Sequence, residues 1–111
     1  MAKVVLSVRV PPEVRRKINE CQQPGESISR FVLAAIVEYL RRVEEEMTIY
    51  VDAKTDQSYV GIGVFIDESL RDRLEELAEI ATRQLGFKVS IAAIVRKAIE
   101  MKLEECMKFL A

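Results

Sequence analysis

The stretch KVVLSVRV at Lys3–Val10, followed at once by Pro11 and Pro12, decides the fold. Successive side chains of a β-strand point to opposite faces, so its alternation predicts a strand with one face made to be buried. The inward residues would be Val4, Leu6, Val8 and Val10, and the outward residues Val5, Ser7 and Arg9. A serine hydroxyl both donates and accepts, and arginine carries a rigid fork of donors. We therefore expect the outward face to contact a polar partner.

Two amphipathic helices are expected after this strand. Pro12 suits the first position of a helix, in which Val14, Ile18 and Cys21 would form an apolar stripe. A turn at Pro24 and Gly25 ends it. Ser27 is the expected N-cap of the second helix, whose apolar positions are Ile28, Phe31, Val32, Ala35, Ile36 and Tyr39.

The start of the second helix is also a candidate anion site. Helix N-termini present N–H groups and the positive end of the helix dipole to phosphates, so Ser27 has a capping role and a phosphate role that are compatible. Arg30 lies in the same first turn, where it opposes the dipole unless an anion is near. The basic side chains of the first helix, Arg15, Arg16 and Lys17, fit either phosphate contacts or an ordinary solvated face.

The chain repeats itself. Val60, Ile62, Val64 and Ile66 alternate as the first strand does, 56 positions later, and Leu70 and Leu74 repeat Val14 and Ile18. After a helix longer by seven residues that ends near Gly86, Ser90 and Ile91 match Ser27 and Ile28. We expect three parts: a first repeat at 1–46, a connector at 47–58 and a second repeat at 59–111. Thr48–Val51 is rich in β-forming residues and predicts either a short extra strand or an extended linker.

Composition restricts the function. The 111 residues contain no histidine, which removes the usual general base and the commonest metal ligand, so we expect neither an enzyme nor a cofactor or metal. Residues 1–43 hold eight Lys or Arg and four Glu, a net charge of +4, whereas 44–111 hold nine Lys or Arg and 14 Asp or Glu, a net charge of −5. This contrast predicts a basic first repeat and an acidic second one.

Cys21 and Cys106 are 85 positions apart and belong to no metal-binding spacing, so we expect reduced, packed thiols. No leader or long apolar span is evident, which favours an intracellular, cytoplasmic protein without a membrane partner. The abundance of Glu, Lys, Arg and Ile favours a heat-adapted source.

The two repeats resemble the ribbon-helix-helix DNA-binding proteins, here as a tandem pair. The resemblance runs through LSVRVPPEVRRKI with GESISRFVLAAIVEYL, and again through VGIGVFIDESLRDRL with GFKVSIAAIVRKAIEMKL. It implies a mostly α fold in which two repeats pair their strands into a short antiparallel β-ribbon and share one intertwined core. It also implies that the ribbon enters the DNA major groove, with its outward side chains on the bases and the N-terminus of each second helix on phosphate.

Carried over by position, the resemblance assigns base contacts to Val5, Ser7 and Arg9. It assigns phosphate contacts to Ser27, Ile28, Ser29, Arg30 and Ser90. The second repeat departs from the pattern, because its outward positions are Gly61, Gly63 and Phe65. That repeat would be a structural partner, with Gly61 leaving room beside Arg9, or would pack its glycine face against Thr48–Val51. Phe65 would be a wedge against DNA or an anchor for protein.

Two assemblies remain open. The repeats pair within the chain, which we favour because tethering raises the local concentration of the partner, or the first repeats of two chains pair. The leading functional hypothesis is a sequence-specific double-stranded DNA-binding transcriptional regulator, repressor or activator, that self-associates on DNA. The alternatives are an accessory protein for plasmid partition or conjugation, and an antitoxin-like protein-binding adaptor. No small-molecule ligand is indicated.

Overall fold

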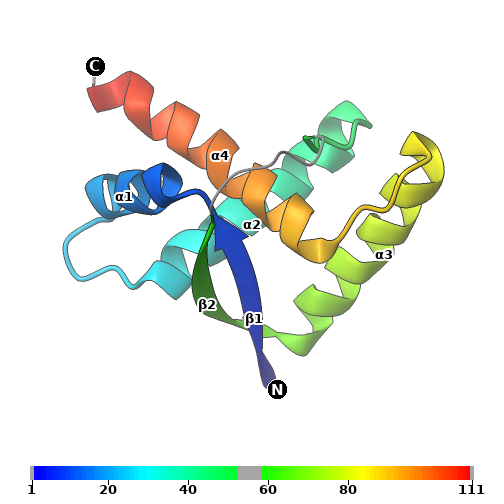
Figure 1. Cartoon of the computed structure of the whole chain (residues 1–111), viewed down its shortest axis with the longest axis horizontal. Helices are drawn as coiled ribbons and strands as arrows, with labels where there is room; N and C mark the ends of the chain where they lie inside the picture. The colour runs from blue at the N-terminus through cyan, green and yellow to red at the C-terminus, as the bar shows by residue number, and fades with distance from the viewer. Residues whose placement is uncertain (1, 53–58, 111) are drawn as a thin grey trace.

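The computed structural model describes residues 2–52 and 59–110 and contains two strands and four helices in that part of the chain (Figure 1). In chain order these are β1 (Lys3–Val10), α1 (Pro12–Cys21), α2 (Ile28–Glu46), β2 (Val60–Asp67), α3 (Glu68–Leu85) and α4 (Ile91–Leu110). The order strand, helix, helix therefore occurs twice, as the internal repeat predicts. Figure 1 shows the strands at the centre, with α1 and α3 on opposite sides of them.

The two strands form an antiparallel sheet in which β1 pairs with β2 of the same chain. Ser7 pairs with Gly63, which is also its counterpart 56 positions later in the second repeat. A residue can face its own counterpart only at a twofold axis, so the register places a pseudo-twofold axis between Ser7 and Gly63. The alternation is as expected, since Val8, Val10, Val64 and Ile66 are buried while the residues between them are exposed.

The second helix of each repeat packs on the strand of the other repeat. α2 lies against β2, α4 lies against β1, and α2 and α4 also pack on each other. The core therefore draws on both repeats, and equivalent residues such as Ile18 and Leu74 are both fully buried. Burying such a side chain contributes roughly 1.5–3 kcal/mol. Neither repeat could cover its own apolar strand face without the other.

Both second helices begin as the sequence predicts. Ser27 Oγ accepts a hydrogen bond from Arg30 N–H at 3.2 Å, and Ser90 Oγ accepts one from Ala93 N–H at 3.1 Å. α3 ends at Gly86, whose φ of 78° is left-handed and accessible to glycine without strain. The N-termini of the two second helices thus have the same chemistry, whereas the first helices end differently, since α1 is followed by Gln22 in an extended conformation.

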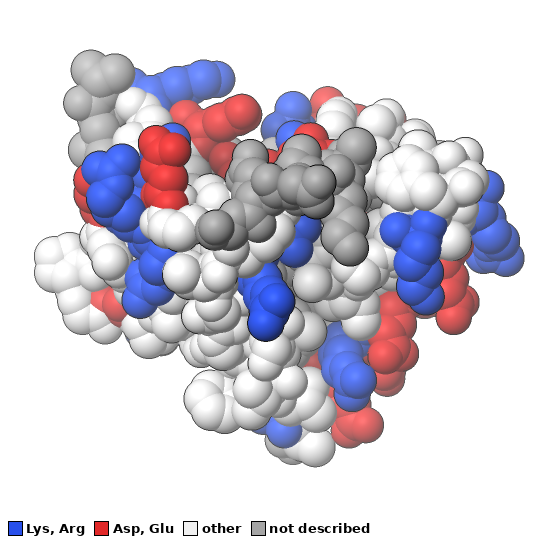
Figure 2. All heavy atoms as spheres, in the orientation of Figure 1, with Lys and Arg blue, Asp and Glu red and all other residues white. Residues whose placement is uncertain are grey.

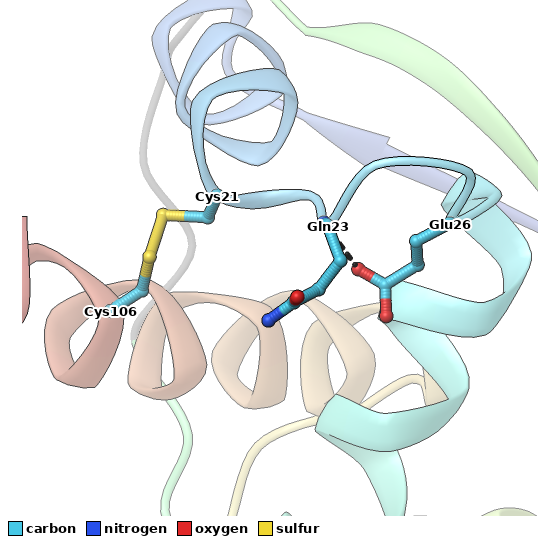
Figure 3. The surroundings of a disulfide bond; sticks show 4 residues. All are labelled: Cys21, Gln23, Glu26 and Cys106. Carbon is cyan, nitrogen blue, oxygen red and sulfur yellow. Dashed lines mark hydrogen bonds between the residues drawn. A yellow bond between two sulfur atoms is a disulfide. The ribbon is translucent and has the colours of Figure 1, made fainter.

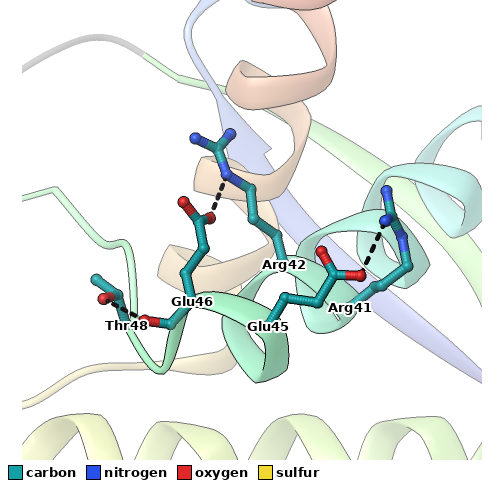
Figure 4. Close-up of polar contacts among 5 residues, drawn as sticks. All are labelled: Arg41, Arg42, Glu45, Glu46 and Thr48. Carbon is teal, nitrogen blue, oxygen red and sulfur yellow. Dashed lines mark hydrogen bonds and ion pairs between the residues drawn. The ribbon is translucent and has the colours of Figure 1, made fainter.

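Of the two alternatives for Thr48–Val51, the short strand is not formed, and Thr48–Asp52 have no regular structure, which agrees with the linker. α2 continues through the three glutamates to Glu46, where Arg41 and Arg42 pair with Glu45 and Glu46 at 3.2 and 2.6 Å (Figure 4). The connector then runs against the core, held by a hydrogen bond from the buried Tyr39 hydroxyl to the carbonyl oxygen of Tyr50. This hydrogen bond and the packing of Ile49, Tyr50 and Val51 against the core hold the segment in place without a neighbouring strand. The rest of the connector, 53–58, lies outside the described residues.

The expectation of reduced cysteines is wrong. Cys21 at the end of α1 and Cys106 in α4 form a disulfide, with Cα atoms 6.3 Å apart (Figure 3). The tertiary packing of α1 on α4 brings together two residues that the sequence separates by 85 positions. This bond joins the first repeat to the second.

No helix within the described residues is both long enough and apolar enough to cross a lipid bilayer.

Candidate nucleic-acid interface

The outer face of the β-ribbon collects the residues that the sequence singles out. Val5, Ser7 and Arg9 of β1 are exposed there, and so are their partners Phe65, Gly63 and Gly61 of β2. Among the described residues, the Arg9 guanidinium takes part in no ion pair or side-chain hydrogen bond. Arginine donors in this state are available to an external acceptor. We call these six residues the ribbon face.

The outer edges of both strands are covered by side chains from the second helices. Ser29 Oγ of α2 accepts a hydrogen bond from Phe65 N–H at 3.2 Å, and Arg96 Nε of α4 donates to the Arg9 carbonyl oxygen at 2.8 Å. The Arg96 guanidinium also lies over the ring of Tyr59, 5.0 Å from its centroid. These contacts occupy strand-edge groups that would otherwise be open to another strand.

The same hydrogen bonds show how close the side chains of the ribbon face are across the strands. Because Phe65 N–H and Arg9 C=O point away from the partner strand, the pairs Val5–Phe65 and Arg9–Gly61 are not hydrogen-bonded to each other. In antiparallel sheets such pairs have the closer Cα atoms, about 4.5 Å apart. The side chains of Val5 and Phe65 thus form one contiguous patch on the ribbon face, and Arg9 lies directly beside the backbone of Gly61.

The two glycines of the ribbon face have open space above them. A Cβ atom built on Gly61 or Gly63 meets no heavy atom within 4 Å. The expected alternative in which this glycine face packs against Thr48–Val51 is therefore wrong, because no backbone covers it. Because the glycines have no side chains, the β2 side of the ribbon face is bare at its centre and at one end. The Arg9 side chain projects at that end, opposite Gly61.

The N-termini of both second helices flank the ribbon. The hydrogen bond from Phe65 to Ser29 places the first turn of α2 beside β2. On the other side, a groove of about 830 Å³ is lined by Ser7 of β1, by Lys88, Ser90 and Ile91 before and at the start of α4, and by Glu75, Glu79 and Arg83 of α3. Helix geometry leaves the first N–H groups of each helix without intrahelical acceptors. The predicted phosphate residues Ser27, Ile28, Ser29, Arg30 and Ser90 thus lie in two clusters, one on each side.

The expected contrast in charge between the repeats is largely removed by the true helix boundary. Because α2 ends at Glu46, the first repeat at 1–46 holds eight basic and seven acidic residues, a net charge of +1. Residues 59–111 hold eight and nine, a net charge of −1. On the face that Figure 2 shows, acidic side chains lie over α3 and also on the side of α1 and the end of α4, and basic side chains are spread between them. On the ribbon face, Arg9 is the charged residue.

A carboxyl pair lies between the connector and α4. Burial, and then the hydrogen bond and charge of Asp52, raise the pKa of Glu100 to about 7. The same hydrogen bond, with Lys97 and Arg96, lowers the pKa of Asp52, whose Oδ1 is 3.1 Å from Lys97 Nζ. A proton shared between the two carboxyls stabilises the contact of the connector with α4.

Sequence reasoning missed two residues of this region. Arg96 lies within a helix whose sequence indicates only that it is helical. Its contact with the Arg9 carbonyl oxygen joins residues 87 positions apart, so no local pattern indicates it. Lys88 follows Gly86 in what looks like an ordinary turn, yet it lines the groove beside Ser7. Lys88 lies two residues before the capping Ser90, but its counterpart in the first repeat is Gly25, so the internal repeat gives no signal for it.

Comparison with known proteins adds no relative: no family model, no curated protein and no solved structure matches the chain.

Proposed function

We propose that this chain is a tandem ribbon-helix-helix protein that binds double-stranded DNA in a sequence-specific manner and regulates transcription. The β1–β2 ribbon enters the major groove, Arg9 and Ser7 contact base edges, and the N-termini of α2 and α4 contact phosphates on either side. A two-stranded ribbon has the width that the major groove admits. The protein acts inside the cell, where its DNA target lies.

One observation carries this proposal: an exposed arginine, whose guanidinium has no partner among the described residues, lies on a ribbon that has a helix N-terminus on each side. Base readout needs donors that project from a narrow element, and Arg9 opposite Gly61 provides them. Phosphate contacts fix the position of a protein on the duplex, and the two helix starts are suited to them. The pseudo-twofold axis of the ribbon matches the approximate twofold symmetry of a duplex.

The same chemistry serves plasmid partition or conjugation. The genomic position of the bound site distinguishes the two roles, since a regulator binds at promoters and an accessory protein binds at a partition or transfer origin.

Selection of bound sequences from a random DNA pool, followed by affinity measurement at several salt concentrations, tests the proposal. We expect a defined site and an affinity that falls steeply as salt rises, because phosphate contacts release counterions. A complex that is insensitive to salt, or no DNA enrichment at all, overturns it in favour of a protein-binding adaptor.

The first prediction concerns Arg9. Replacing Arg9 with alanine removes a bidentate contact worth about 1–3 kcal/mol of discrimination, so the preference for guanine should fall roughly 5- to 150-fold. The matched control is Arg71→Ala on α3, where the arginine is exposed and pairs with Glu75 at 3.6 Å. The control should bind as the unmodified protein does. Equal base preference in both variants would remove Arg9 from the reading set.

A further inference from the structure

The two ends of the ribbon face are equivalent in position but unlike in chemistry. Phe65 is the counterpart of Arg9, 56 positions later, and Gly61 is the counterpart of Val5. Across the strands, Arg9 faces Gly61 and Phe65 faces Val5. The pseudo-twofold axis between Ser7 and Gly63 therefore relates a guanidinium at one end to an aromatic ring at the other.

The Phe65 end is an exposed apolar patch. Val5 is 61% exposed and Phe65 is 59% exposed, although both belong to well-ordered strands with buried neighbours on the inner face. The two residues form a directly facing pair, so their side chains lie close together. Nothing in the described part of the chain covers this pair. The inner faces of the same strands already supply buried apolar residues, so Val5 and Phe65 are not needed for the core.

We propose that the DNA site is asymmetric, with Arg9 contacting a guanine at one end, Ser7 contacting a base at the centre, and Val5 with Phe65 contacting thymine methyl groups at the other end. The inference rests on the proposed function and assigns the Phe65 side chain of the second repeat to thymine. Val5 and Arg9 are four residues apart, so the two ends of the ribbon face are separated by about 13 Å. That distance corresponds to about four base-pair steps.

Thymine is the base that the chemistry of this pair selects. The C5-methyl group of thymine is the one apolar group that a base pair presents in the major groove, and phenylalanine is among the side chains that contact it. Apolar wedges between base steps, in contrast, belong to proteins that bind the minor groove. A ribbon that presents Arg9 to guanine in the major groove presents Phe65 to the same groove.

The first test uses the selected site with uracil in place of thymine at the Phe65 end, which removes the methyl groups and leaves every hydrogen-bonding group unchanged. Loss of one buried methyl contact should weaken binding about fourfold. In the Phe65→Ser variant the same replacement should have a smaller effect, because only the Val5 contact remains, and in the double variant Val5→Ser with Phe65→Ser it should have none. Phe109→Ser, at a residue 87% exposed on α4, is the matched control and should retain the full uracil effect.

The second test makes the ends alike. Because residue 65 is the counterpart of residue 9, Phe65→Arg should shift the preferred base at that end from thymine to guanine and give a site with guanine at both ends. The double variant Val5→Gly with Phe65→Arg reproduces the Arg9–Gly61 pair completely and should strengthen this shift. Circular dichroism confirms that each variant is folded before its preference is measured.

The outcomes separate this inference from the function on which it rests. If the chain binds a defined site through Arg9, but uracil replacement and Phe65→Arg leave the preference unchanged, the asymmetric site is wrong and the DNA-binding function stands. If no DNA is selected at all, both fail. Uracil sensitivity that is undiminished in Phe65→Ser would exclude Phe65 as a contacting residue.

Discussion

Ser27 and Ser90 show how one residue type serves stability and binding at the same place. Each caps a second helix by accepting from the N–H group three residues later. The remaining N–H groups of the first turn point outward, beside the ribbon. A cap therefore orients the very groups that the proposal assigns to phosphate.

Alanine at these serines separates the two roles. Ser27→Ala and Ser90→Ala should each lower the free energy of unfolding by about 1 kcal/mol, because each loses one capping hydrogen bond. Both should also weaken binding to all DNA sequences alike, since phosphate contacts carry no base preference. Thermal unfolding and DNA titration measure the two effects. A variant that loses stability but keeps its full affinity would show that its helix start is structural only.

Glu100 predicts how stability depends on pH. Its pKa is raised from 4.5 when unfolded to about 7 in the fold, so the folded state binds the extra proton between these values. Stability therefore falls as pH rises through this window. Lys97 and Arg96 favour the charged form and oppose part of the rise in pKa. The lowered pKa of Asp52 contributes stability that is fully present above its unfolded value of 3.8 and is lost as the pH falls below that value.

Replacing Glu100 with glutamine mimics the protonated carboxyl at every pH. The variant should lack the decline in unfolding free energy between about pH 4.5 and 7 that Glu100 causes. Chemical denaturation at a series of pH values measures the decline, and Glu104→Gln on the exposed side of α4 is the control. Parallel pH profiles for the Glu100 variant and the unmodified protein would contradict the raised pKa.

At the scale of elements, the two glycines of β2 make this strand less stable than other residues would. Gly61 and Gly63 have open space above them, so no packing in the free protein requires glycine. Glycine in a strand costs roughly 0.5–1 kcal/mol relative to alanine. Close approach of a DNA backbone or base edge is the use that fits the open face.

Gly63→Ala tests this reading of the strand. The variant should be more stable by about 0.5–1 kcal/mol, since the added methyl group meets nothing and the unfolded chain loses freedom. DNA affinity should fall, because the methyl group stands at the centre of the ribbon face. Gly86→Ala is not a suitable control, since its φ of 78° strains any other residue, and Ser69→Ala at the exposed start of α3 serves instead. Unchanged affinity in Gly63→Ala would place the ribbon centre away from DNA.

The elements were predictable from sequence because each has a local signal. Period-two alternation marks β1 and β2, helical spacing marks the four helices, and the capping serines and Gly86 mark their ends. The missing strand at Thr48–Val51 is a different case. Its β-rich composition is real, but the hydrogen bond from Tyr39 to Tyr50 and packing on the core decide its conformation, and neither contact has a local signature.

At the scale of the whole molecule, long-range contacts limit what sequence can predict. The ribbon-face residues follow from alternation alone, so Val5, Ser7, Arg9 and their partners could be named in advance. The disulfide and the contact of Arg96 with Arg9 depend on how the two repeats interlock. The charge contrast failed for the opposite reason: a boundary three residues too early excluded the glutamates that neutralise Arg41 and Arg42.

The Cys21–Cys106 disulfide should stabilise the interlocked pair of repeats. It closes a loop of 85 positions, and removing a disulfide of this kind from a small domain costs about 2–5 kcal/mol. The double variant Cys21→Ser with Cys106→Ser should melt at a lower temperature, and reductant should lower the melting temperature of the unmodified protein but not that of the variant. Melting that is unaffected by reductant and by the double substitution would mean that the bond does not contribute.

The unlike ends of the ribbon have a consequence for direction. A symmetric dimer can sit on its target either way round, because half a turn about its axis restores the same surface. Here the turn exchanges Arg9 with Phe65 and yields a different surface. If the proposed DNA contacts are correct, only one of the two placements matches the bases. The bound protein would then have a single orientation on its site. Its α3 helix, which is rich in acidic residues, would always lie toward the same flanking sequence and face whatever protein is bound there.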